Sequence, residues 1–139
     1  MDENDFEVEN IPDKDSVYSW VHRSLLRNKA PEYWKTAVPN TVFRPKDGKI
    51  SADWSNYSTP EKSRLNASEP QLNGVIGTIV RSIRKIAPLV VLHSPRLGRR
   101  SHCDIIGFPK RSDDLKEIRV YLSRAFEWKI TLEPEDSLS

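Results

Sequence analysis

Two histidines and a group of arginines lie close together in the sequence, on either side of one short loop. His93 ends an apolar run, and His102 and Asp104 follow the loop that carries Arg99 and Arg100. If the flanking segments are neighbouring strands, the loop brings both imidazoles to one end of a sheet. Imidazoles transfer protons near neutral pH and arginines bind phosphate, so this group could act on a phosphodiester or a nucleotide. His93, His102 and Asp104 are therefore the candidate catalytic residues.

The single cysteine, Cys103, lies between His102 and Asp104. Alternation along a strand turns its side chain away from both neighbours, so we expect a buried, inert thiol rather than a cysteine–histidine dyad. One cysteine cannot form an intrachain disulfide, and no cysteine–histidine spacing suits zinc. Neither a GxGxxG pattern nor a Walker pattern is present, so we expect no metal and no cofactor.

Charge is distributed unevenly along a chain of 139 residues whose formal net charge is only +2. The first 15 residues carry seven acidic residues and one lysine. Eight basic residues lie between positions 78 and 111, where the only acid is Asp104: Arg81, Arg84, Lys85, Arg96, Arg99, Arg100, Lys110 and Arg111. This segregation predicts a basic surface that attracts an anionic partner, either nucleic acid or an acidic face of a protein. The alternative is that these side chains are solvated and only keep the protein soluble.

Four tryptophans and four tyrosines are a generous aromatic content for this length. Trp54 and Tyr57 lie in a polar stretch and are candidates for stacking on a base or for an interface, with Trp54 the best candidate for an exposed aromatic. Trp20 and Trp128 fall in segments expected to be helical, and we expect them to fill the core.

Two functions from different classes are compatible with these residues. The first is a non-enzymatic binding or accessory module whose basic surface, residues 81–111, holds the anionic partner. The second is a small phosphodiester- or nucleotide-acting enzyme in which His93 and His102 transfer protons. We favour the first, because the familiar catalytic motifs are missing.

The elements that position these residues predict an α+β fold. Apolar residues at helical spacing predict a helix from Ser16 to about Lys29, followed by another short turn of helix. The Ser58 and Glu61 pair predicts a short capped helix. We expect a central sheet of about three to five strands, with strands over 75–80, 89–92 and 102–108 and a loose hairpin before them. One long C-terminal helix, opened by Asp114, closes the domain.

The chain divides into three parts by composition. Residues 1–15 lack apolar periodicity and predict an acidic flexible arm, residues 16–131 form a single domain, and residues 132–139 form an acidic tail. No apolar stretch is long enough to span a bilayer, and the acidic start differs from a secretory signal. We therefore expect a cytoplasmic protein without a membrane partner.

Overall fold

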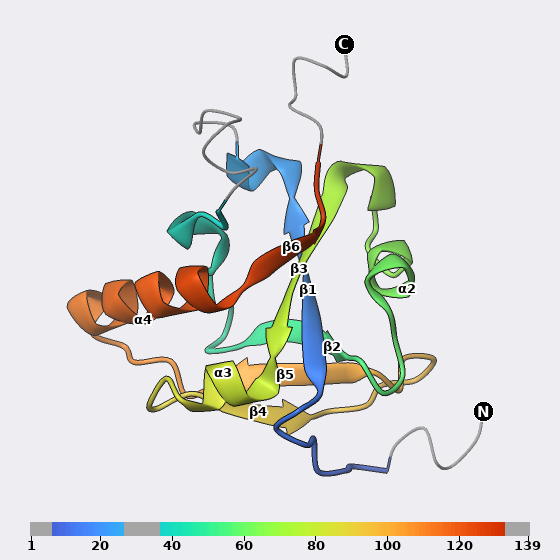
Figure 1. Cartoon of the computed structure of the whole chain (residues 1–139), viewed down its shortest axis with the longest axis horizontal. Helices are drawn as coiled ribbons and strands as arrows, with labels where there is room; N and C mark the ends of the chain where they lie inside the picture. Colours follow the sequence, from blue (N-terminus) through green and yellow to red (C-terminus); the bar gives the residue numbers. More distant parts are fainter. Residues whose placement is uncertain (1–6, 27–36, 133–139) are drawn as a thin grey trace.

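Six antiparallel strands form one sheet in this protein, described by a computed structural model over residues 7–26 and 37–132 (Figure 1). In chain order the strands are β1 (Ser16–His22), β2 (Ile50–Trp54), β3 (Asn73–Ile79), β4 (Val90–His93), β5 (His102–Ile106) and β6 (Glu127–Ile130). Across the sheet their order is β4-β5-β2-β1-β3-β6. The α-helices are α2 (Pro60–Leu65), α3 (Val80–Arg84) and α4 (Ser112–Ala125), and short 3-10 turns are η2 (Arg23–Leu26), η3 (Asn40–Val42) and η4 (Pro70–Leu72).

The sheet consists of two three-stranded halves that meet along a short seam. β1 pairs with β3 over seven residues but with β2 at only two positions, Val17 opposite Trp54 and Tyr18 opposite Asp53. In Figure 1 the strands β1 and β3 run up the molecule, whereas β2, β4 and β5 run across it. The two halves therefore diverge beyond the seam.

One face of the sheet carries the core. Val17, Ile76 and Ile105 are almost fully buried there. They belong to one apolar cluster with Leu122 of the 14-residue helix α4 and with Phe126, which follows that helix. Burying apolar side chains of this size stabilises each by about 1.5–3 kcal/mol relative to exposure. This packing fixes α4 against the sheet.

The opposite face is partly covered by the short helix α2. The indole N–H of Trp20 donates to the Ser63 carbonyl at 2.5 Å, which ties β1 to this helix. Thr59 caps α2 by accepting a hydrogen bond from the Lys62 amide at 3.1 Å, and Pro60 begins the helix. The predicted short helix is thus present, but its cap is Thr59 rather than Ser58.

The predicted α+β organisation, with leading helices and a sheet of three to five strands, is wrong. The structure is mostly sheet, with six strands and one longer helix packed on it. The expected first helix is strand β1, in which Val17, Ser19 and Val21 are buried and their neighbours are half-buried. That period of two, together with hydrogen bonding to β3, outweighs the helical spacing of the apolar residues. Residues 23–26 of the predicted helix form the 3-10 turn η2. Its remainder, and most of the short helical turn predicted after it, fall within residues 27–36, outside the described residues.

The long helix is also not the last element. α4 begins at Ser112 rather than Asp114 and ends at Ala125, and the chain then returns as strand β6 beside β3. Trp128 therefore lies on a strand and not on a helix. No helix in the described part of the chain is long and apolar enough to cross a membrane.

The predicted flexible arm is described from residue 7 onward, and this part lies against the domain. The side chain of Ile11 is only 4% exposed and belongs to the core cluster. The backbone N–H of Val80 donates to the Asp15 carbonyl at 2.8 Å, and that of Arg81 donates to the Asp13 carbonyl at 3.0 Å. Residues 1–6 of the predicted arm, and 133–139 of the predicted tail, lie outside the described residues.

Candidate anion-binding surface

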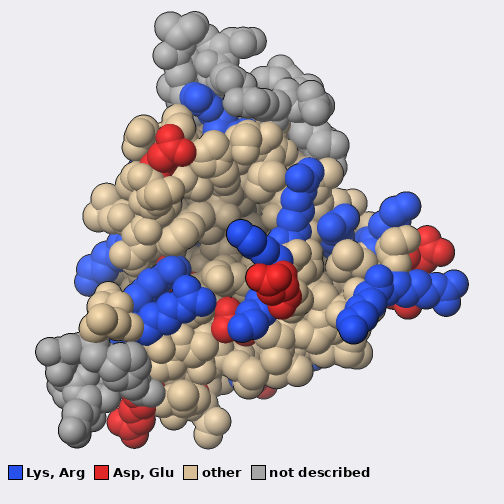
Figure 2. Space-filling view, turned by 180° about the vertical axis from the view of Figure 1, so that it is seen from behind, with Lys and Arg blue, Asp and Glu red and all other residues tan. Residues whose placement is uncertain are grey.

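The basic residues predicted to form one surface lie on three separate parts of the fold. They are found on or directly after α3 (Arg81, Arg84, Lys85), in the loop between β4 and β5 (Arg96, Arg99, Arg100) and just before α4 (Lys110, Arg111). The face seen in Figure 2 carries more Lys and Arg than Asp and Glu atoms, and several of the basic side chains border a hollow near its middle. The eight predicted cations therefore come from different elements of the fold.

Asp53, on β2, anchors the loop between β4 and β5. Its carboxylate is fully buried on β2. Arg99 donates to it twice, from Nε at 2.8 Å and from Nη2 at 2.9 Å, and Ser101 Oγ donates at 2.8 Å. Ser63 of α2 also donates its hydroxyl hydrogen to this carboxylate. A buried carboxylate with four donors is fully satisfied, so this group acts as a structural anchor.

A tight turn presents Arg99 and Arg100 in different directions. Arg96 and Arg99 exchange backbone hydrogen bonds of 3.1 and 2.8 Å, and Gly98 between them has a φ of +72°, which favours glycine. The guanidinium of Arg99 turns inward to Asp53 and lies 4.7 Å from the ring centroid of Trp20. Arg99 therefore shapes the site, while the next arginine turns toward Tyr57.

Arg100 stacks on Tyr57, with its guanidinium 4.2 Å from the ring centroid. The Tyr57 hydroxyl donates to the Glu9 carboxylate at 2.5 Å, and Arg100 Nη2 reaches the same carboxylate oxygen at 3.4 Å. The hydrogen bond between Tyr57 and Glu9 raises the pKa of Tyr57 and lowers the pKa of Glu9. Glu9, from the acidic N-terminal segment, thus contacts Arg100, one of the predicted cations.

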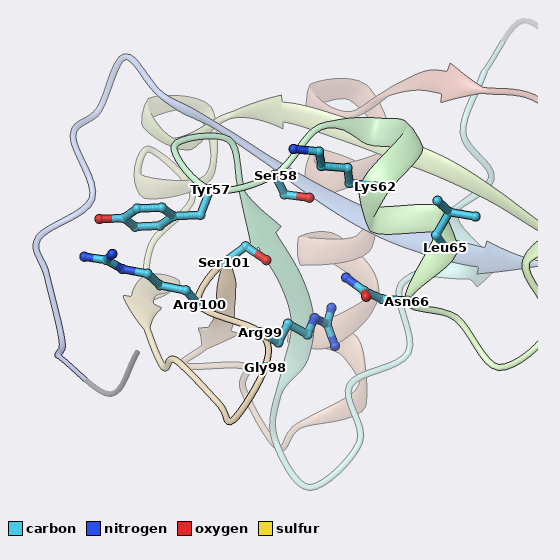
Figure 3. A pocket seen from close by; sticks show the side chains of 9 residues that line it. All are labelled: Tyr57, Ser58, Lys62, Leu65, Asn66, Gly98, Arg99, Arg100 and Ser101. Carbon is cyan, nitrogen blue, oxygen red and sulfur yellow. The ribbon is translucent and has the colours of Figure 1, made fainter. Parts of the chain in front are cut away.

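A pocket of about 330 Å³ opens beside this pair (Figure 3). Its lining comes from the segment before α2, from α2 and its end, and from the turn of the β4–β5 loop: Tyr57, Ser58, Lys62, Leu65, Asn66, Gly98, Arg99, Arg100 and Ser101. In Figure 3 the Lys62 and Arg100 side chains lie on opposite sides of the hydroxyls of Ser58 and Ser101. The hydroxyls of Ser58 and Ser101 already donate to the Thr59 carbonyl and to the Asp53 carboxylate. The two cations, Lys62 and Arg100, are the donors suited to an oxyanion such as phosphate.

A second contact joins the acidic segment to α3. Arg84 donates from Nη1 to the Asp13 carboxylate at 2.6 Å and to the Ile11 carbonyl at 2.7 Å. Arg81, Lys85 and Arg96 have exposed side chains and form no ion pair within the described part of the chain. The same is true of Lys110 and Arg111. Of the eight predicted basic residues, three are therefore engaged in ion pairs and five point to solvent.

The two histidines predicted to act together point to opposite faces of the sheet. His93 pairs with Cys103 across the β4–β5 ladder, so His102 faces the other way. The Glu9 amide donates to His93 Nδ1 at 3.0 Å, and His93 Nε2 donates to the Arg100 carbonyl at 2.7 Å. Both ring nitrogens of His93 are thus committed to backbone groups. The convergence on which the enzyme hypothesis depended is not found.

His102 is fully buried, and burial lowers its pKa. Its Nδ1 lies 2.9 Å from the Ser94 carbonyl, which can only accept, so Nδ1 carries the hydrogen and Nε2 has the lone pair. Asp104 Oδ1 lies 3.9 Å from Nε2, beyond hydrogen-bond distance. His102 and Asp104 share a face of the sheet without a direct bond.

Two predictions about single residues have different outcomes. Trp54, expected to be exposed, is 3% exposed, and its indole N–H donates to Asp15 at 2.8 Å. It cannot stack on a base, because Tyr57 and His93 pack edge-on against it. Cys103 is a buried free cysteine, as predicted, and burial raises the pKa of its thiol.

Several residues of this surface were missed from the sequence. Asp53, Ser63 and Ser101 form the anchor, Glu9 supplies the carboxylate on Arg100, and Lys62 lines the pocket. Only Asp53 could have been identified from the sequence. An acid inside the strand-like run Ile50–Trp54 is expected to be buried, and a buried carboxylate needs hydrogen-bond donors. The other four become neighbours only through the folded topology.

Compared with protein-family models, with curated proteins and with solved structures, the chain has no significant match.

Proposed function

We propose that this domain is a non-enzymatic binding module that holds a single strand of nucleic acid by its phosphates. The observation that carries the proposal is the pocket beside the β4–β5 loop, where Lys62 and Arg100 flank the hydroxyls of Ser58 and Ser101. A phosphate oxygen is a strong acceptor for the ammonium of Lys62 and the guanidinium of Arg100, whereas both hydroxyls already donate within the protein. The pocket has room for one phosphate group, and exposed Arg96, on the same turn, suits a neighbouring phosphate of a longer chain.

The incomplete hydrogen bonding of Arg100 supports a ligand in this pocket. Its Nε is buried and has no hydrogen-bond partner among the described residues, and its contact with Glu9 is long at 3.4 Å. A buried donor without an acceptor is unfavourable by about 1–3 kcal/mol. A phosphate in the pocket would supply acceptors to this guanidinium without disturbing the anchor between Arg99 and Asp53.

An extended polyanion suits the remaining cations better than a compact acidic face does. Arg96 lies on the turn next to the pocket, while Arg81 and Lys85 belong to or follow α3 and are exposed. Such groups are not rigidly oriented toward one point, and contacts with a charged backbone do not need them to be. Tyr57 is not expected to stack on a base, because Arg100 covers one face of its ring.

The test is a salt titration of binding to poly-thymidine DNA, followed by fluorescence anisotropy. A double variant, Lys62→Ala with Arg100→Ala, removes two phosphate contacts and should flatten the slope of log K against log salt by about 1.4 units. Arg99 is left in place, because removing it would leave Asp53 buried without its cation. The matched control is Lys116→Ala on α4, an exposed lysine outside the pocket, which should leave the slope unchanged.

Two results would contradict the proposal. One is an absence of binding to single strands even at low salt, and the other is an unchanged slope in the double variant. Tight binding to poly-glutamate without binding to DNA would assign the surface to an acidic protein partner instead.

A further inference from the structure

A second and larger hollow, of about 630 Å³, lies where the two halves of the sheet diverge. β1 and β2 pair at only two positions, and beyond them Trp20 on β1 and Ser51 on β2 both line the open space. Its volume falls within the roughly 300–1,000 Å³ of small-molecule sites. Arg96 borders this hollow as well as belonging to the basic surface, but none of the residues lining the pocket of Figure 3 does.

The walls of this hollow combine apolar and cationic side chains. Val42, Phe43 and Ile76 contribute apolar surface. Four cations also line it: Arg44, Lys46, Lys49 and Arg96. They outnumber the acids of the lining, Asp47 and Asp104, by two. None of these four forms an ion pair within the part of the chain that the structure describes. A ligand that fits must therefore join an apolar or planar body to a group with more than one negative charge.

Asp104 indicates that the ligand, besides its apolar body and its negative charge, also needs a hydrogen-bond donor. It lines the hollow, yet it is only 8% exposed, and its Oδ1 is buried with no hydrogen-bond partner among the described residues. His102 Nε2, 3.9 Å away, is also buried and unpartnered and carries a lone pair. Two acceptors thus face each other without a donor. Buried acceptors are normally satisfied, so the arrangement calls for a donor group from elsewhere.

We propose that this hollow binds a mononucleotide whose base carries an exocyclic amino group. The base lies against the apolar wall, its amino group donates to Asp104, and its phosphate is held by the lysines and arginines at the rim. A simple fatty acid lacks the donor, and an amino acid carries one carboxylate for a lining whose cations outnumber its acids by two. The inference stands apart from strand binding, because free nucleotides could bind here even if DNA did not bind at the surface.

Cytidine and uridine monophosphates provide the sharpest test, because they are similar in size and differ in whether an amino or a carbonyl group occupies one ring position. Isothermal titration calorimetry of the full chain should give roughly tenfold or greater preference for the cytidine nucleotide, since uridine would leave Asp104 without a donor. Unphosphorylated cytidine should bind more weakly than its monophosphate. This comparison uses the unaltered protein and does not depend on how any variant folds.

Two variants locate the binding. Asp104→Asn introduces a donor that can meet the uridine carbonyl, so the preference for cytidine should fall by at least about tenfold or reverse. Lys46→Ala with Lys49→Ala should weaken both nucleotides equally, and the control Lys116→Ala should change neither. Equal affinity for the two nucleotides, a preference retained in Asp104→Asn, or no binding at millimolar nucleotide would overturn the inference. DNA binding without nucleotide selectivity would leave the proposed function standing and reject this site.

Discussion

The guanidinium of Arg99 makes a two-point contact with the buried carboxylate of Asp53, from a loop 46 residues further along the chain. This pair fixes the turn of residues 96–99 against β2 and α2. Arg99 is held inward, whereas Arg100 lines the pocket with its guanidinium on the Tyr57 ring. The rigid pair therefore positions the residue that we expect to contact the ligand.

Removing the acid of this pair should destabilise the fold strongly. Asp53→Ala leaves Arg99 and two hydroxyls without their acceptor in a buried position, which typically costs about 3–5 kcal/mol. Urea unfolding followed by tryptophan fluorescence measures the loss. Asp114→Ala, an exposed acid on α4, should stay within about 0.5 kcal/mol of the unaltered protein. A loss below about 1 kcal/mol in Asp53→Ala would show that the pair is not an anchor.

The helix α4 should be the main apolar support of the sheet. Leu122 is fully buried, so Leu122→Ala should cost about 2–5 kcal/mol through lost burial and the cavity left behind. Leu65 on α2 is 72% exposed, and Leu65→Ala provides the matched control with a change of about 0.5 kcal/mol or less. Equal effects of the two changes in urea unfolding would contradict this role of α4.

Several elements could be predicted from the sequence because local signals and tertiary packing agree. The β-branched run of β3 and the apolar stripe of α4 are such cases, and so is the proline start of α2. The helix prediction for Ser16–His22 was wrong because Val17, Trp20 and Val21 fit one face of a helix as well as they fit a strand. Pairing with β3 selects the strand. Strand β6 was not predicted, because it has only four residues and is defined by its pairing with β3.

The candidate site was less predictable than the fold. The loop with Arg99 and Arg100 was identified from its charge, but the opposite directions of the two side chains depend on Asp53. Glu9 lies 91 residues from Arg100, and no local pattern links them. His93 and His102 were expected to converge because they flank one loop. The ladder register, which the sequence does not reveal, separates them.

The acidic segment should compete with the ligand for Arg100. Glu9→Gln removes the carboxylate charge beside the pocket, so affinity for poly-thymidine DNA should rise by up to about fivefold. Fluorescence anisotropy at low salt measures the change, with Asp114→Asn on α4 as the charge-matched control. An unchanged or weaker affinity in Glu9→Gln would mean that Glu9 does not shield the site.

The contact between Glu9 and Tyr57 should depend on pH in a defined direction. The pKa of Glu9 is lowered in the fold, so the stability that it contributes is present above its unfolded pKa and is lost as pH falls through its folded pKa. The pKa of Tyr57 is raised chiefly by the same hydrogen bond, so Glu9→Gln should bring it down toward its ordinary value. NMR titration of the Tyr57 ring signals gives this midpoint. An identical midpoint in both proteins would show that the hydrogen bond is absent in solution.

The most direct test of the central claim is an NMR titration of the isotopically labelled protein with poly-thymidine DNA. We predict that the backbone amide signals of Gly98, Arg100 and Ser101 move together with those of Lys62 and Asn66, because these residues line one pocket. The exposed face of α4, at Lys116 and Glu117, should give no comparable shifts. Shifts confined to α4, or no shifts at low salt, would contradict the claim that this pocket binds a nucleic-acid strand.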